Sequence, residues 1–490
     1  MVSNNVVIGL EIHTQITSLK TKLFCSCPSD YRGKPPNTNV CPTCLGLPGA
    51  LPVVNVNAIK AAIMVALALR CSISDLLVFT RKHYFYPDLP KNYQISQYDG
   101  IGSMPIAKNG YVILNIDGNI KKIRIRRINI EEDPGRLIYP TGSLLTSKYT
   151  LIDYNRSGIA LLEIVTEPDI STPKEAKVFI DKIRSILEHL GITDPNLEGS
   201  IRVDANISLA GGSRVEVKNI SSPKDVERAL AYEIIRQSKM LGSGEVVRRE
   251  TRHWDSVRKV TVPLRAKELE EDYRYFPDPD LPPIKITKEL IMDIASKLPE
   301  LPDQRIERFV RSYGISEYLA NVLVLEKSLA DYFEECVGIC GNPELVGNIV
   351  VNDLKRWIDE LNLEVIEAKK LLPANQLCKL IQLLINNSIN IKILKEVLPK
   401  ALRSGKDVIS IIYEEGYMDI SDEKMLMKIV EEVFKENQQA VKDALDNPKA
   451  INYLVGQVMK KTKGRANPSI TNKLITMKLA EIRGTPKNDR

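Results

Sequence analysis

The sequence predicts an α+β protein in which a strand-rich N-terminal domain precedes two helical domains. In roughly the first 290 residues, segments that alternate between polar and apolar residues are interspersed with helical patterns, which is typical of an antiparallel sheet packed against helices. Asn109-Gly110 and Asp117-Gly118 are both typical of hairpin turns. From residue 298 the apolar residues recur at helical spacing, and a polar segment at 403–407 interrupts them. We therefore expect domains at 1–297, 298–405 and 406–490.

The composition is that of an ordinary globular protein of 490 residues, with 27% charged and 43% hydrophobic residues. No apolar run approaches the ~20 residues that are needed to cross a membrane. The N-terminus lacks a basic segment followed by an apolar one, so a secretory signal is not apparent. These features lead us to expect a cytoplasmic protein without a membrane partner.

The positive charge is concentrated near the C-terminus. The net charge is +6, and residues 456–490 alone hold nine Lys or Arg against two acidic residues, a local charge of +7. A basic tail on a nearly neutral body indicates contact with a polyanion. A solubilising tail is the alternative that charge alone leaves open.

The segment 6–16 alternates between apolar and polar residues and predicts a β-strand with two different faces. Its aliphatic residues lie on one face, whereas Glu11, His13 and Gln15 lie on the other. An acid, an imidazole and an amide on one face could begin a metal or phosphate site. The alternative is an edge strand whose polar face is solvated.

Further acidic residues end or interrupt other predicted strands. Residues 131–133 are three adjacent acids that would repel one another without a nearby cation. Glu163 lies among aliphatic neighbours, where a charge is costly without a partner. Asp204 shares a strand face with Arg202 and Asn206. Oxygen ligands with one imidazole suit Mg²⁺, which proteins often hold together with substrate phosphates. Neither a Walker A sequence nor a dinucleotide-binding fingerprint occurs, so an ATP site would be of another type.

Residues 81–97 interleave cations, aromatic residues and amides, with two prolines that stiffen the chain. Such a segment could bind a phosphate and stack a base. A rigid surface loop with aromatic residues packed beneath it explains the same pattern.

Four of the eight cysteines form two close pairs that are separated by 13 residues. In a cytosolic chain such pairs favour a metal over disulfides, and four thiolates suit a tetrahedral Zn²⁺ with a structural role. Reduced structural cysteines are the alternative. The other four cysteines are scattered along the sequence. The predicted zinc ligands are Cys25, Cys27, Cys41 and Cys44.

Eight segments together resemble the family of B subunits of tRNA-dependent amidotransferases, in the family's order. They are residues 7–13, 81–88, 93–97, 131–133, 162–169, 202–208, 272–277 and 464–468. The resemblance implies a cradle domain similar to glutamine synthetase, then a helical domain and a small helical tail that contacts tRNA. It also implies that ATP and Mg²⁺ are used to phosphorylate the side-chain carboxylate of Glu-tRNA(Gln) or Asp-tRNA(Asn). Ammonia released from glutamine by a partner A subunit would displace the phosphate, in a complex that also contains a C subunit.

The segments that carry the resemblance also imply the residues of the site. His13, Glu132 and Glu163 are the expected Mg²⁺ ligands. Alternation places Glu131 and Asp133 on one face of the strand and Glu132 on the other, but it does not show which face lies in the site. Glu132 is therefore chosen by its place in the motif. The other residues expected in catalysis are Glu11, Lys82 and Asp204. Those expected to bind ATP or the aminoacyl end are Tyr84, Asp88, Lys91, Ser96 and Arg274.

Two other functions are compatible with these residues. The chain could be a non-catalytic tRNA-binding or assembly subunit, in which the acidic strand face is structural. It could also be a stand-alone amide ligase of the glutamine synthetase type that acts on free amino acids.

Overall fold

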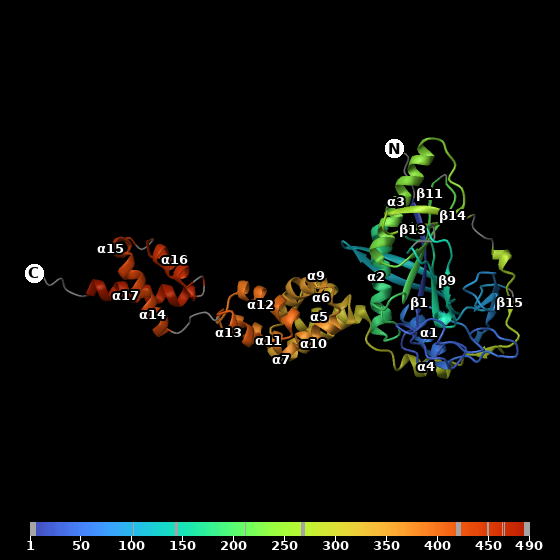
Figure 1. Cartoon of the computed structure of the whole chain (residues 1–490), viewed down its shortest axis with the longest axis horizontal. Helices are drawn as coiled ribbons and strands as arrows, with labels where there is room; N and C mark the ends of the chain where they lie inside the picture. The colour runs from blue at the N-terminus through green and yellow to red at the C-terminus, as the bar shows by residue number, and fades with distance from the viewer. Residues whose placement is uncertain are drawn as a thin grey trace, which may run out of the picture. The chain divides into compact units, whose positions relative to one another are not determined.

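The computed structural model describes residues 6–100, 102–142, 146–210, 212–265, 270–417, 423–447, 450–462, 464 and 466–484 (Figure 1). The chain forms two compact units, Met1–Arg305 and Ile306–Arg490. The first contains strands and helices, and the second is helical in its described parts. The expected order of a strand-rich α+β part followed by a helical part is therefore confirmed.

The first unit is built on a nine-stranded sheet with the order β14-β13-β12-β11-β1-β10-β7-β6-β2. The central strand β1 (Val6–Gln15) runs antiparallel to β10 (Ala160–Thr166) on one side and to β11 (Ile201–Leu209) on the other. The remaining strands are β2 (Ser72–Ile73), β6 (Ala107–Ile116), β7 (Asn119–Glu132), β12 (Val215–Ile220), β13 (Glu250–Asp255) and β14 (Val260–Arg265). The N-terminal segment is thus an inner strand, and the interpretation of it as an edge strand is wrong.

One strand pair departs from the antiparallel arrangement that the sequence predicts. Strands β12 and β13 run parallel. Helix α3 (Pro223–Gly242) connects them, and parallel neighbours need such a crossover because a tight hairpin reverses the chain direction. The sheet is therefore mixed, and the expectation of a purely antiparallel sheet is wrong at this pair.

Helices cover the apolar face of the sheet. Helices α1 (Val56–Ala68) and α2 (Pro173–His189) pack on β6, and α3 packs on β11 (Figure 1). The aliphatic side chains Ile8, Leu10 and Ile12 of β1 are at most 1% exposed in this core. The opposite face of β1 carries its polar residues, as the alternation predicts. Helix α4 (Lys288–Ala295) also packs in this unit, through the buried Ile294.

Short strands complete the first unit. A three-stranded sheet joins β4 (Thr80–His83), β5 (Tyr93–Ser96) and β15 (Phe276–Pro277). Two-stranded sheets join β3 (Leu76–Leu77) to β16 (Ile284–Lys285), and β8 (Arg136–Ile138) to β9 (Leu151–Asp153).

Only one of the two predicted hairpin turns is present. Asp117 and Gly118 join β6 to β7 with positive φ angles, as expected. Asn109 and Gly110 lie inside β6, so that prediction is wrong. A Cβ at Gly110 would lie 2.2 Å from Cys71 Sγ, so this glycine permits a close approach of the segment after α1.

The helical part contains two separate hydrophobic cores in its described residues. The first extends from Phe309 to Ile412 and the second from Leu426 to Leu479. Val408, in the expected third domain, packs in the first core. The helices are α5 (Pro302–Tyr313), α6 (Glu317–Val324), α7 (Lys327–Cys340), α8 (Pro343–Ile349), α9 (Lys355–Glu360), α10 (Val365–Leu371), α11 (Ala374–Ile385), α12 (Ile391–Ser404), α13 (Val408–Glu414), α14 (Glu423–Glu436), α15 (Gln438–Asp446), α16 (Ile451–Lys461) and α17 (Pro468–Gly484), and a π-helical turn at Val350–Leu354 precedes α9.

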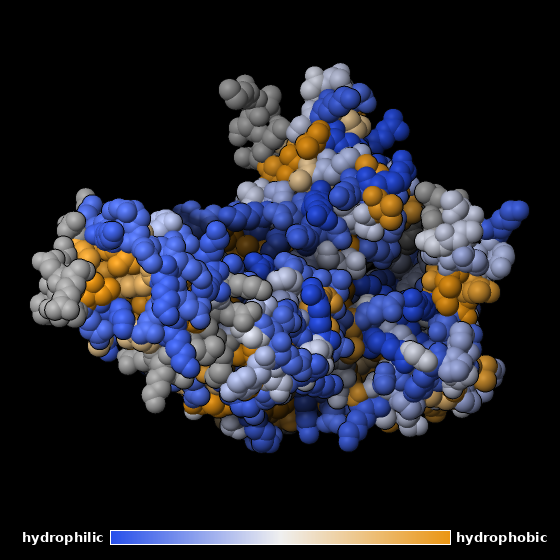
Figure 2. All heavy atoms as spheres, turned by 60° about the vertical axis from the view of Figure 1, so that its left-hand side comes forward, coloured by the Kyte–Doolittle hydropathy of each residue, from blue (hydrophilic) through white to orange (hydrophobic). Residues whose placement is uncertain are grey.

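Part of the predicted basic tail lies outside the described residues, namely Lys463, Arg465, Lys487 and Arg490. The described helices include none that combines the length and the apolar character needed to cross a bilayer. On the face shown in Figure 2, hydrophilic residues cover most of the surface, and hydrophobic residues form separate patches.

Candidate active site and cysteine cluster

The strand register places a row of polar side chains across the middle of the sheet. His13 is opposite Glu163 on one side and Arg202 on the other, and Glu163 is opposite Asn129 of β7. Directly opposite residues share a face of the sheet. His13 Nε2 lies 3.8 Å from Glu163 Oε1, and Asn129 Nδ2 donates to Glu163 Oε2 at 2.6 Å. The costly buried charge of Glu163 therefore has partners.

A second acidic group lies on the same face beside this row. Glu11 is directly opposite Asp204, and Glu216 of β12 offers a carboxylate oxygen within 4.8 Å of an oxygen of each. Asn206 Nδ2 donates to Glu11 Oε1 at 3.1 Å. Lys218 Nζ lies 3.2 Å from Asp204 Oδ2 and balances part of the negative charge.

The acid that joins His13 and Glu163 is Glu131. One ligand atom from each of the three residues lies within 4.8 Å of the others. The buried Glu131 carboxylate also accepts from Ser96 Oγ and, at 3.2 Å, from Gln94 Nε2. Ser96, expected to bind ATP or the aminoacyl end, thus contacts a candidate metal ligand.

Glu132, the acid chosen from the motif, points to the opposite side of β7. Its carboxylate accepts from Lys91 Nζ and, at 2.9 Å, from the Ile95 backbone N–H. Both Lys91 and Glu132 line a small cavity of about 60 Å³ that also includes Cys25 and Cys44. The structure therefore does not bring Glu132 or Lys91 together with His13 and Glu163.

The acids of the polar face differ in the direction in which their surroundings shift their pKa values. Burial raises the pKa of Glu11 and of Glu131, and the neighbouring Glu163 carboxylate raises both further. Burial also acts to raise the pKa of Glu163, but Arg127 and His13 outweigh it and hold that pKa below its ordinary value. Crowded carboxylates of this kind favour binding of a cation among them.

A cavity of about 620 Å³ opens over this face and combines anionic, cationic and aromatic walls. The half-buried Lys82 ammonium lies 4.9 Å from the centre of the Tyr273 ring. Burial disfavours its charge, but Tyr275 and Glu131 hold the pKa of Lys82 well above its ordinary value. The cavity is lined by the acids Glu11, Glu131, Glu163, Glu167 and Glu216, the cations Lys82, Arg126, Arg127, Arg214, Lys218 and Arg249, and the tyrosines Tyr98, Tyr273 and Tyr275, among others.

The remaining predicted residues lie around the cavity or away from it. Tyr84 Oη donates to Gln94 Oε1 at 3.3 Å, and Gln94 in turn donates to Glu131. Asp88 is half-buried, and burial raises its pKa, but it does not line the cavity. Arg274 is exposed and lies over the Phe85 ring at 5.7 Å, whereas the tyrosines on both sides of it line the cavity.

Both acidic groups fit hard divalent cations such as Mg²⁺. They offer carboxylate oxygens, and His13 adds one imidazole nitrogen. Asn129 Oδ1 is buried in this wall without a hydrogen-bond partner among the described residues, so a carbonyl oxygen is also available. Cations on the other walls suit the phosphates that such ions accompany.

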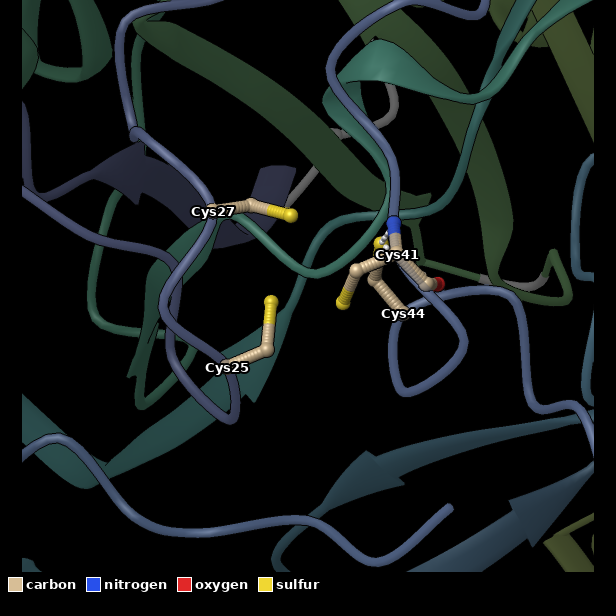
Figure 3. A group of neighbouring side chains, drawn as sticks. All are labelled: Cys25, Cys27, Cys41 and Cys44. Carbon is tan, nitrogen blue, oxygen red and sulfur yellow. Dashed lines mark hydrogen bonds between the residues drawn. The ribbon is translucent and has the colours of Figure 1, made fainter. Parts of the chain in front are cut away.

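The four predicted zinc ligands converge from two loops. Figure 3 shows Cys25 and Cys27 on one loop facing Cys41 and Cys44 on the other, with their sulfur atoms directed between the loops. The four Sγ atoms all lie within 4.8 Å of one another. Four thiols at this separation fit a tetrahedral Zn²⁺.

The environment of the cluster favours a thiolate at Cys44, whereas burial and hydrogen bonding within the cluster raise the pKa of Cys25 and of Cys27. Hydrogen bonding from Cys25 and from the Cys41 backbone N–H, together with the nearby Lys22 ammonium, lowers the pKa of the Cys44 thiol to about 4. Lys22 is fully buried, and its Nζ donates to Asn39 O at 2.9 Å and to Cys44 Sγ at 3.7 Å. A buried cation here balances negative charge on the sulfur atoms.

Sequence reasoning missed Glu131 and Glu216 as members of the acidic groups. Asp133, just past the end of β7, accepts from Gln15 Nε2 of β1 at 2.6 Å, which places the side of Glu131 and Asp133 on the His13 face. This contact depends on the pairing of distant strands, so the sequence held no local signal that selects Glu131. Glu216 required the pairing of β12 with β11, which no local pattern reveals.

Two known protein families match successive parts of the chain. Residues 6–292 match the family described as the GatB/GatE catalytic domain, and residues 331–479 match the family described as the GatB domain. The first match contains both acidic groups and the cysteine cluster.

Curated relatives resemble the chain over nearly its whole length, and each is named as the B subunit of an aspartyl/glutamyl-tRNA(Asn/Gln) amidotransferase. The protein of Sulfurisphaera tokodaii is 60% identical over 96% of this chain and 98% of its own length. The protein of Saccharolobus solfataricus is 58% identical over 97% of this chain and 99% of its own length. That of Thermotoga maritima is 47% identical over 96% and 98%.

Proposed function

Because the chain belongs to the family of aspartyl/glutamyl-tRNA(Asn/Gln) amidotransferase B subunits, we propose that it activates the side-chain carboxylate of Glu-tRNA(Gln), Asp-tRNA(Asn) or both. The carboxylate would attack the γ-phosphorus of ATP, giving an acyl phosphate and ADP. Ammonia supplied by the glutaminase A subunit would then attack the acyl carbon and release phosphate. The observation that supports this proposal is the convergence of two carboxylate groups and several cations on one cavity.

His13, Glu131 and Glu163 would hold one Mg²⁺, and Glu11, Asp204 and Glu216 a second. When bound, these ions would neutralise the phosphoryl oxygens and orient them for in-line transfer. We propose Glu131 in place of Glu132, because Glu131 is the acid that lies beside His13 and Glu163.

The cations and tyrosines of the cavity have separate roles in this proposal. Lys82 keeps its positive charge and would bind a phosphate oxygen or the acyl phosphate. Arg126, Arg214 and Arg249 line the same cavity and would bind the remaining phosphates. Tyr98 and Tyr275 stack with ring centres 4.4 Å apart and would extend an aromatic surface to a base.

The finer features of the family are also proposals for this chain. The first unit would have a fold of the glutamine synthetase type. Cys25, Cys27, Cys41 and Cys44 would hold a structural Zn²⁺ that cross-links two loops. The complex would contain the A and C subunits in the cytoplasm, and the basic tail within 406–490 would bind the tRNA.

Reconstitution tests this function. The chain is combined with its A and C subunits, glutamine, ATP, Mg²⁺ and each misacylated tRNA. We expect amidation that requires ATP and yields ADP and phosphate. We further expect that His13→Ala and Glu163→Gln each reduce the rate at least ~100-fold while tRNA affinity is retained, with rates measured below the unfolding midpoint of each variant.

Two outcomes would favour the alternatives. Amidation at a nearly unchanged rate in both variants would indicate that the acidic face is structural. Amidation of free glutamate or aspartate without tRNA would indicate a stand-alone amide ligase.

A further inference from the structure

Three cysteines that are scattered in the sequence meet between two helices of the second unit. Cys336 and Cys340 lie one turn apart on α7, and Cys378 lies on α11. Cys378 Sγ is 2.8 Å from Cys340 Sγ, and the Cys340 thiol donates to the Cys336 carbonyl oxygen at 3.1 Å. All three are free thiols. We propose that Cys340 and Cys378 are a redox pair that forms a reversible disulfide between α7 and α11.

The position of the third cysteine, Cys336, decides between a thiol pair and a metal site. The Cys336 carbonyl oxygen accepts from the Cys340 thiol at 3.1 Å and from the Cys378 thiol at 3.3 Å, and the Cys336 thiol also hydrogen-bonds with Cys378. Among the described residues, the groups of three or more ligand atoms that lie close enough for a metal do not include these cysteines. Two sulfur atoms in contact therefore favour oxidation to a disulfide over coordination of an ion.

The difference in exposure sets the order of the steps. Cys340 is the last residue of α7 and is half-buried, whereas Cys378 is 1% exposed. Cys340 would lose its proton to solvent and attack a sulfur of a small-molecule disulfide such as oxidised glutathione, releasing one thiol. Cys378 would then attack the Cys340 sulfur, lose its proton and release the second thiol. The two electrons from the protein thiols reduce the oxidant.

The bond would constrain the core of this part of the chain. It would close a loop of 38 residues between two helices that pack against each other. A link of this length restricts the unfolded chain and raises the unfolding midpoint by roughly 5–10 °C. Burial raises the pKa of Cys340 to about 12, so the rate of oxidation would rise about tenfold per pH unit between pH 7 and 9.

Peptide mapping of the full chain tests the proposal. The purified protein is incubated with oxidised glutathione, its remaining thiols are alkylated, and it is digested with trypsin. We expect a cross-linked product of residues 328–355 with residues 371–379, which reduction separates. Cys340→Ser and Cys378→Ser should each abolish it, whereas Cys336→Ser and the control Cys71→Ser should retain it.

Thermal unfolding provides the second measurement. The thermal unfolding midpoint of the oxidised protein should exceed that of the reduced protein. The share of this increase that comes from the Cys340–Cys378 bond should be absent in Cys378→Ser. The absence of the cross-linked peptide from native oxidised protein would overturn the proposal. A cross-link through Cys336 in place of Cys340 would also overturn it.

Discussion

Glu131 and Glu132 are adjacent in β7, but their carboxylates belong to different sites. Glu131 lies beside His13 and lines the large cavity, whereas Glu132 binds Lys91 beside the cysteine cluster. Successive side chains of a strand point to opposite faces, so one dipeptide joins the candidate metal site to the candidate zinc site.

This pair provides a matched test of the metal ligands. Glu131→Gln should raise the Mg²⁺ concentration that gives half-maximal amidation at least ~10-fold, because a ligand loses its charge. Glu132→Gln should leave this concentration unchanged but lower the free energy of unfolding by roughly 3–5 kcal/mol, because the Lys91 side chain, which is 7% exposed, loses its partner. Magnesium titration and denaturant unfolding measure the two effects. A shift in the magnesium requirement from Glu132→Gln alone would restore Glu132 as the ligand.

A second prediction concerns the buried cation of the cysteine cluster. Lys22→Met should reduce zinc affinity roughly 10-fold or more, because the charge beside Cys44 is removed. Competition with a chromophoric chelator measures this affinity. Lys20→Met removes an exposed lysine two residues away and is the control. Equal zinc affinity in the two variants would show that Lys22 has no part in binding the metal.

A third prediction concerns tRNA binding by the last helices. A chain ending at residue 417 keeps the core that contains Val408 and removes the later core. Its tRNA affinity should fall, and the dependence of that affinity on salt should become shallower. Lys460→Glu within the basic stretch should act in the same direction, and the exposed Lys442→Glu on α15 is the control. Filter binding at several salt concentrations measures both effects. Unchanged affinity after truncation would assign tRNA binding to residues 1–417.

A fourth prediction concerns acid stability. Glu233 of α3 is fully buried, and Arg236 donates to its Oε1 at 2.9 Å. Burial acts to raise its pKa, but the hydrogen bonds from Arg236, Gln237 and Thr261 hold the pKa below its ordinary value of 4.5. The folded state therefore binds this proton less tightly than the unfolded state does. The resulting stability is complete above pH 4.5 and is lost as the pH falls through the depressed pKa.

Substitution of this residue should change the acid limb of the stability curve. Glu233→Gln should cost roughly 3–5 kcal/mol at pH 7, because Arg236 and Arg252 are left without their buried partner. Below pH 4.5 its stability should fall less steeply than that of the original chain. The exposed Glu245→Gln is the control. Denaturant unfolding between pH 3 and 7 measures the difference, and parallel curves would contradict the assignment.

The sequence was most informative where a local period determines the structure. Alternation in β1 correctly separated Ile12 from His13, and the helical spacing that begins near residue 298 correctly indicated the helical part. Pairing between distant strands was not accessible in this way. The partners of Glu11 on β11 and β12, and the contact between Cys340 and Cys378, depend on register and helix packing. The motif that selected Glu132 also contains Glu131, and only the surrounding strands distinguish the two.

The central position of β1 has a consequence for how this chain can vary. Deletion of one residue between its ends would turn Ile12 into the cavity and His13 into the helix-packed core, on both sides of the sheet at once. A change of length within β1 would therefore exchange its two faces, whereas a substitution alters one side chain and keeps the register.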